Sequence, residues 1–134
     1  MKLIADANVL LSAVLGGRAA RVLTHPQIEE VLTPQLVFEE VEEYALMLAG
    51  KRKIPPEAIL LAVASLPISV VERKTYERSI SEARRLIERR DPDDIDVLAL
   101  ALHLKLPLWS NDNDFTGTGI EWFTTAEVLK ILKS

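Results

Sequence analysis

The sequence predicts an α/β fold, a three-layer α/β/α sandwich with a mostly parallel sheet of four to five strands. Short apolar and β-branched stretches alternate along the chain with longer segments whose apolar residues recur every three or four positions. Proline, glycine and helix-capping residues separate the two kinds of segment. Strands that alternate with helices pair in parallel, and the helices then cover both faces of the sheet.

The first half of the chain is expected to hold two strands and three helices. In chain order these are a strand at Lys2–Ala5, helices at about Val9–Leu15 and Ala19–Leu23, a strand at Glu30–Thr33 and a helix from Pro34 to Gly50. Thr33 is a good N-cap residue, and Pro34 suits the first helical position because it has no N–H to leave unsatisfied. Gly50 is expected to end the helix.

The second half repeats the alternation. In chain order we expect a helix at Glu57–Ser65, a strand at Ile68–Val71, helices at Ser79–Arg90 and from Pro92 to His103, strands at Pro107–Ser110 and Glu121–Phe123, and a final helix. Asp91 before Pro92 is again a capping residue followed by proline. Thr124 and Glu127 have the spacing of a capping box at the start of the last helix.

Length and composition limit the possible classes of protein. A chain of 134 residues holds one core, so a single domain over 1–134 is expected, and its high apolar content (49%) points weakly to a further buried surface in an oligomer. The absence of cysteine excludes disulfides and thiolate metal sites, and it fits the reducing cytoplasm. The net charge is −4 (16 basic and 20 acidic residues), but without four acids at a metal site the balance is 16 to 16. Net charge therefore does not exclude a nucleic-acid substrate.

Four acidic residues fall where a parallel sheet places its ligands, beyond the carboxyl ends of the strands. Asp6 directly follows the first strand, and Asp112 lies two residues past the fourth. Glu40 is in the second turn of the helix that leaves the second strand, and Asp94 is in the first turn of the helix that leads to the fourth. Two carboxylates about 4 Å apart repel by roughly 4 kcal/mol at an effective dielectric constant of 20. Such a cluster must be protonated, dispersed or neutralised by cations.

Carboxylate ligands without cysteine or histidine favour Mg²⁺ or Mn²⁺. Divalent metals held by carboxylates suit the hydrolysis of phosphodiester bonds, because a metal can generate hydroxide and stabilise the departing oxygen. The sequence alone leaves simpler interpretations open. Asp94 and its neighbours Asp93 and Asp96 could be first-turn acids that complement the helix dipole, and Glu40 stands in an acidic run typical of a solvated helix face. Asp6 is the hardest to explain structurally, because a charge at the end of a buried strand is costly unless it is partnered.

Four segments resemble, in the right order, the motifs of the PIN-domain nucleases, the fold shared by the VapC toxins of prokaryotic toxin–antitoxin pairs. These segments are Ile4–Leu10 with Asp6 and Asn8, Thr33–Val41 with Glu40, Asp91–Leu102 with Asp94, and Ser110–Phe115 with Asp112 and Asp114. Two features depart from the family pattern. Ser110 stands where threonine is commoner, and Asp96 adds an acid so close to Asp94 that the metal-ligand assignment could move between the two.

The resemblance implies a Mg²⁺- or Mn²⁺-dependent endoribonuclease that forms homodimers and is neutralised by an antitoxin. Its expected catalytic metal ligands are Asp6, Glu40, Asp94 and Asp112, with Asp114 or Asp96 as candidates for a further ligand. Asn8 would hydrogen-bond a water on the metal, and Ser110 would keep a hydroxyl near the site. Among the basic clusters, Lys51, Arg52 and Lys53 are the expected RNA contacts, because their helix also carries Glu40.

Three other interpretations compete with this one. A PIN scaffold that has lost its metal and only binds RNA or a protein is disfavoured, because all four ligand positions are acidic. A haloacid-type phosphohydrolase needs a second Asp two places after Asp6, where this chain has Asn8. A phosphoacceptor receiver domain needs an Asp at the end of the third strand, where this chain has Val71, Glu72 and Arg73.

Overall fold

The computed structural model describes residues 1–87 and 93–132, and within them five strands form one parallel sheet. The strands are β1 (Lys2–Ala5), β2 (Glu30–Pro34), β3 (Ser69–Val71), β4 (Leu108–Trp109) and β5 (Trp122–Phe123). Their order across the sheet is β3-β2-β1-β4-β5, and every neighbouring pair is parallel. The predicted α/β/α sandwich with a parallel sheet is confirmed.

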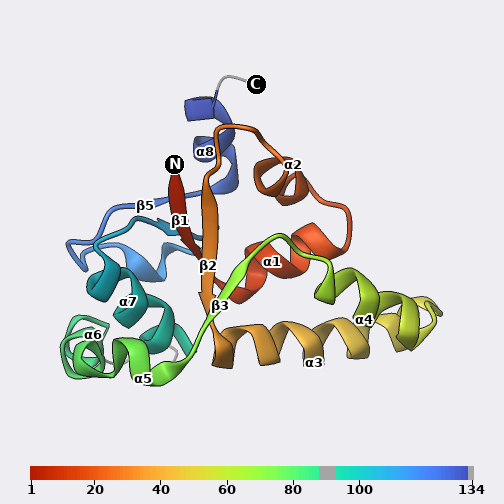
Figure 1. Cartoon of the computed structure of the whole chain (residues 1–134), viewed down its shortest axis with the longest axis horizontal. Coiled ribbons are helices and arrows are strands. Elements are labelled where there is room, and N and C mark those ends of the chain that lie inside the picture. The colour runs from red at the N-terminus through yellow and green to blue at the C-terminus, as the bar shows by residue number, and fades with distance from the viewer. Residues whose placement is uncertain (88–92, 133–134) are drawn as a thin grey trace.

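Helices cover both faces of this sheet (Figure 1). In the described residues they are α1 (Ala7–Val14), α2 (Ala19–Leu23), α3 (Gln35–Arg52), α4 (Pro56–Ala64), α5 (Arg73–Tyr76), α6 (Ile80–Leu86), α7 (Asp93–Leu104) and α8 (Thr125–Leu132), with the 3₁₀ turns η1 (Glu77–Ser79) and η2 (Asn113–Phe115). Leu3 and Val31 of the sheet pack with α1–α4 and α8 on one face. Ile4 and Leu32, the next residue in each strand, pack with α5–α7 on the other. The period-two alternation of strand side chains thus builds two cores.

The helix boundaries depart from prediction around α3. Thr33 does not cap this helix, because β2 continues to Pro34, and the Thr33 hydroxyl instead donates a hydrogen bond of 3.0 Å to the Ala5 carbonyl of β1. Gly50 does not end the helix either. Ala49 is buried in the same core cluster as residues of α4, and α3 continues to Arg52, where Lys53 takes the left-handed conformation that ends it.

The segment after β3 also differs from the prediction. The expected Ser79–Arg90 helix is α6, which begins at Ile80 and is preceded by the unpredicted α5 and η1. The end of that predicted helix and the expected cap at Asp91–Pro92 lie outside the described residues. The capping box at the last helix is confirmed, because the Glu127 carboxylate accepts from the Thr124 N–H and the Thr124 hydroxyl accepts from the Glu127 N–H.

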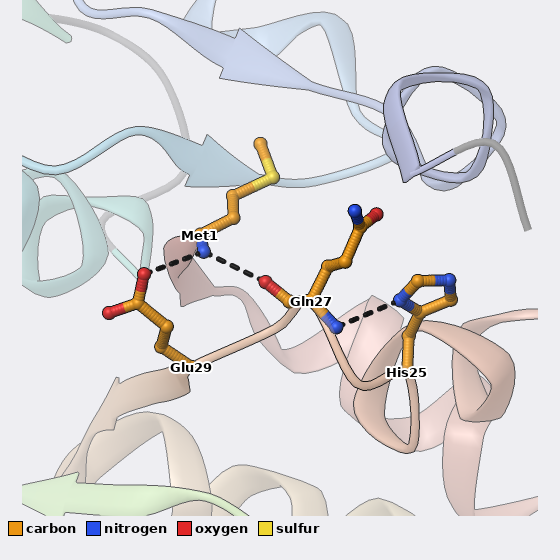
Figure 2. Close-up of polar contacts among 4 residues, drawn as sticks. All are labelled: Met1, His25, Gln27 and Glu29. Carbon is orange, nitrogen blue, oxygen red and sulfur yellow. Dashed lines mark hydrogen bonds and ion pairs between the residues drawn. The ribbon is translucent and has the colours of Figure 1, made fainter.

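The amino ends of β1 and β2 are tied together by the contacts of Met1. Its amino group donates to the Gln27 carbonyl at 2.8 Å and forms an ion pair of 3.1 Å with Glu29 (Figure 2). The Gln27 N–H in turn donates to Nδ1 of His25 at 3.1 Å. These contacts lie at the opposite end of β1 from Asp6. In the described part of the chain, no helix combines the length and the apolar character that crossing a membrane requires.

Candidate metal centre

The four predicted acids line one pocket at the carboxyl edge of the sheet. Asp6 follows β1, Asp112 follows β4, Glu40 lies in the second turn of α3, and Asp94 lies in the first turn of α7. The pocket is a cavity of about 100 Å³. One carboxylate oxygen of Glu40 and one of Asp94 are shielded from solvent. Side chains far apart in sequence therefore meet because the parallel sheet brings its strand ends to one edge.

The most closely grouped carboxylates are those of Asp94, Asp112 and Asp114. Each offers one oxygen, and the three oxygens lie within 4.8 Å of one another. Asp112 caps η2, because its Oδ1 accepts from the Asp114 N–H at 3.1 Å. Asn111 anchors the same loop, because its Oδ1 accepts from the Thr125 N–H at 2.8 Å. Asp112 and Asp114 are thus placed by a hydrogen-bonded turn rather than by a loose loop.

The Asp6 carboxylate caps a helix, and its burial in the pocket affects its pKa. Its Oδ1 accepts from the Val9 N–H at 3.1 Å as the N-cap of α1, and its Oδ2 accepts from the Ser110 hydroxyl. The pKa of Asp6 is raised above its ordinary value of 3.8, mainly by burial and further by the charge of Asp112, against the lowering effect of the Ser110 and Val9 hydrogen bonds. A positive charge in the pocket would relieve the cost of ionising Asp6.

Ser110 connects Asp6 with the loop that carries Asp112. Ala5 of β1 pairs with Trp109 of β4, so the residues that follow, Asp6 and Ser110, leave the sheet side by side. The fully buried Ser110 hydroxyl donates to Asp6 and accepts from the Asp112 N–H at 3.0 Å. Serine stands here in place of the commoner threonine, and its hydroxyl makes both of these hydrogen bonds.

We expect Ser110→Ala to destabilise the protein by about 1–3 kcal/mol, because the part-buried Asp112 N–H and the buried Asp6 carboxylate both lose a partner. Urea denaturation at pH 7 measures this loss. Ser110→Thr is the matched control, since it retains the hydroxyl, and it should lie closer to the wild type in stability. Equal stability of wild type and Ser110→Ala would contradict the bridging role of the hydroxyl.

Asp96, the alternative to Asp94, is directed elsewhere. Its Oδ2 accepts a hydrogen bond of 2.5 Å from the buried Tyr76 hydroxyl and lies 3.5 Å from Nε of Arg73. Burial and the contact with Asp96 raise the pKa of Tyr76. Asp96 is 2% exposed and is not among the residues that line the pocket, whereas Asp94 is.

The remaining predicted residues differ in their distance from the pocket. Asn8 is exposed and lines it. Lys51, Arg52 and Lys53 are exposed at the far end of α3, and the 11 residues from Glu40 to Lys51 correspond to roughly 16 Å along the helix axis. The structure therefore does not bring this basic cluster to the rim of the pocket.

Tyr44 lines the pocket, although the sequence pattern does not single it out as a site residue. The helical pattern places it among the apolar positions of α3, yet it is 44% exposed. It stands four residues after Glu40, a spacing that puts both side chains on the same helix face. That spacing is the signal that could have identified it.

Solved structures with the same fold include several toxin–antitoxin proteins. A toxin–antitoxin complex from Klebsiella pneumoniae is 20% identical with a TM-score of 0.66, over 92% of this chain and 97% of that chain. The VapBC2 structure from Rickettsia felis, bound to a promoter DNA fragment, is 13% identical with a TM-score of 0.67, over 92% and 98%. VapC20 from Mycobacterium tuberculosis, a toxin that cleaves the sarcin–ricin loop, is 19% identical with a TM-score of 0.61, over 88% and 95%.

These identities establish similarity of fold. No curated protein matches the chain in sequence. A family model described as "PIN domain" matches residues 4–133, which is nearly the whole sequence and includes all four acidic motifs. The chain therefore belongs to the PIN-domain family, as those motifs predict.

Proposed function

We propose that this protein is a Mg²⁺- or Mn²⁺-dependent endoribonuclease that acts as the toxin of a toxin–antitoxin pair. The observation that carries the proposal is the shared pocket of Asp6, Glu40, Asp94 and Asp112. Membership of the PIN-domain family supports it, as does the fold shared with VapC20, a toxin that cleaves the sarcin–ricin loop.

The donor set of the pocket fits a hard divalent cation. Asp6, Glu40, Asp94 and Asp112 supply carboxylates to its wall. Asp114 is not among the lining residues, but one of its oxygens lies within 4.8 Å of oxygens of Asp94 and Asp112. Asn8 could hold a water by hydrogen bonding, while Ser110 orients the Asp6 carboxylate. A divalent cation held there supplies Lewis-acid catalysis and a water of lowered pKa at neutral pH. The protein's own part is to hold these carboxylates in fixed positions around a confined cavity.

Labelled RNA incubated with metal-stripped protein tests the activity. Cleavage should require added Mn²⁺ or Mg²⁺ and should stop when EDTA is added in excess. Internal cuts rather than stepwise loss of end nucleotides are expected for an endonuclease. Intact RNA with both metals, or cleavage that persists in EDTA, would contradict the proposal.

The proposed partners are an RNA substrate, an antitoxin protein and a second copy of this chain, all in the cytoplasm. The Klebsiella pneumoniae and Rickettsia felis neighbours are toxin–antitoxin structures, which supports the antitoxin. Exposed apolar side chains on α3 and α4, among them Met47 and Leu61, offer surface that an oligomer could bury. Light scattering of the purified chain measures the oligomeric state directly.

Lys51, Arg52 and Lys53 remain the proposed contacts to RNA phosphates away from the cleavage point. Charge reversal of Lys51 and Arg52 should weaken RNA binding and reduce the dependence of log K on log salt by roughly 0.7 for each phosphate that the protein no longer neutralises. Lys53 is left unchanged because its left-handed φ of 57° makes substitution there a backbone perturbation. Binding titrations at several salt concentrations measure both effects, and an unchanged slope would remove the cluster from the RNA-binding surface.

A metal-free PIN scaffold that only binds RNA or a protein is the second candidate. It predicts RNA binding without cleavage and no heat of Mn²⁺ binding. The retained acids at all four ligand positions favour the enzyme.

A further inference from the structure

Tyr44 is the only exposed aromatic side chain among the protein's seven, all of which lie in the described part of the chain. The other six are buried or half-buried in the two cores: Phe38, Tyr76, Trp109, Phe115, Trp122 and Phe123. Tyr44 is 44% exposed, at a solvent-facing position of α3. Its placement therefore calls for an explanation outside the core.

The exposed ring stands at the acidic pocket. Tyr44 lines the cavity together with Glu40, Asp94 and the other acids. Leu36, one turn before Glu40, is 44% exposed on the same side of α3. Apolar side chains thus stand one turn before and one turn after Glu40 on α3. A site that contacted only phosphates would be expected to have basic side chains at these positions.

The lining of the cavity favours a cation and phosphate oxygens over a nucleobase. The carboxylates of Asp6, Glu40, Asp94 and Asp112 form its acidic wall. These groups suit a cation and the phosphate oxygens that bind to it. Among the residues that line the pocket, Tyr44 alone offers an aromatic face on which a neighbouring base could stack.

We infer that Tyr44 stacks on an unpaired base next to the scissile phosphate and so positions the RNA strand at the proposed metal centre. The inference rests on the proposed ribonuclease function. Aromatic side chains bind single-stranded nucleic acid by stacking on successive bases, and they do so with little dependence on sequence. In a duplex the base faces are already stacked on one another, so a ring at the rim gains a partner only where the RNA is unpaired.

Substitutions at Tyr44 separate stacking from other roles. Tyr44→Phe keeps the ring, Tyr44→Leu keeps an apolar side chain without a ring, and Tyr44→Ala removes both while retaining high helix propensity. With single-stranded RNA and Mn²⁺, kcat/KM should be near wild type for the Phe variant and roughly 5- to 150-fold lower for Leu and Ala, the range measured for loss of one stacked base. Ile131→Ala, at an apolar position of similar exposure on α8, is the matched control and should leave kcat/KM unchanged.

A fluorescent base tests the contact without cleavage. Single-stranded RNA carrying 2-aminopurine at successive positions is mixed with the Asp94→Asn protein and Mn²⁺, so that the RNA stays intact. Quenching at one position is expected, and it should disappear when Tyr44→Leu is added to the Asp94→Asn background. A duplex with the same base should show no such quenching.

The outcomes distinguish this inference from the proposed function. Failure of the wild type to cleave any RNA would overturn the ribonuclease proposal, whereas Tyr44-dependent quenching would still support the stacking contact. Equal kcat/KM for all four proteins with Tyr, Phe, Leu and Ala, or quenching that is independent of Tyr44, would overturn the stacking contact alone. A change in oligomeric state for Tyr44→Ala, with RNA cleavage unchanged, would instead assign the ring to a protein interface.

Discussion

Asp94→Asn is expected to abolish metal-dependent RNA cleavage, lowering kcat/KM by more than about 100-fold. Loss of a residue that only supports a metal ligand typically costs 10- to 100-fold in affinity or activity, and Asp94 is a proposed ligand itself. Its carboxylate lies in the group with Asp112 and Asp114, so its removal takes one of the three most closely spaced oxygens from the site. Steady-state cleavage of labelled RNA with Mn²⁺ measures the effect.

Asp96→Asn is the matched control for this prediction. It removes the same charge from the same helix, but at a side chain held by Tyr76 and Arg73 rather than at the pocket. We expect some loss of stability, because a buried carboxylate loses its ion pair, and cleavage close to wild type below the melting temperature. The opposite pattern, with Asp96→Asn inactive and Asp94→Asn active, would show that the ligand assignment belongs to Asp96.

Asp6→Asn is expected to stabilise the metal-free protein at pH 7. It should also reduce the stabilisation that a bound metal ion provides. The folded state raises the pKa of Asp6 above 3.8, so the folded protein binds this proton more tightly than the unfolded chain does. The stability contributed by the protonated form is present below pH 3.8 and is lost as the pH rises through the folded pKa. Asparagine caps a helix about as well as aspartate, so the substitution should remove the charge without removing the cap of α1.

Thermal unfolding in EDTA measures this effect. Each 1 kcal/mol gained should raise the melting temperature by roughly 3–5 °C for a chain of this size. The wild type should lose stability as the pH rises from acid toward neutral more steeply than the variant does. With Mn²⁺ in excess the order should reverse, because the wild type gains binding free energy that the variant largely lacks. A lower melting temperature of the variant in EDTA would contradict the unfavourable charge at Asp6.

The sheet and the position of the pocket could largely be predicted from the sequence. Both follow from the alternation of strands and helices along the chain. Short apolar strands separated by helices pair in parallel, and the carboxyl ends of β1 and β4 then place Asp6 and Asp112 at one edge. The capping box of Thr124 and Glu127 was predictable for the same kind of reason, since both of its hydrogen bonds are local.

Features set by tertiary contacts were not predictable from the sequence. Thr33 has the chemistry of a helix cap, but its pairing with β3 and its hydrogen bond to Ala5 of β1 keep it in the sheet. α5 is four residues long, which is too short to show a helical pattern. Asp94 and Asp96 lie on different sides of α7, and only the packing against Tyr76 decides which of them faces the pocket.

Calorimetric titration of Mn²⁺ into the metal-stripped protein tests most directly whether these carboxylates hold a divalent cation. The wild type should give a saturable binding heat, and Asp112→Asn should bind at least about 10-fold more weakly while its folded structure is retained. Identical isotherms for the two proteins, or no binding heat for the wild type, would contradict a metal centre built from Asp6, Glu40, Asp94 and Asp112.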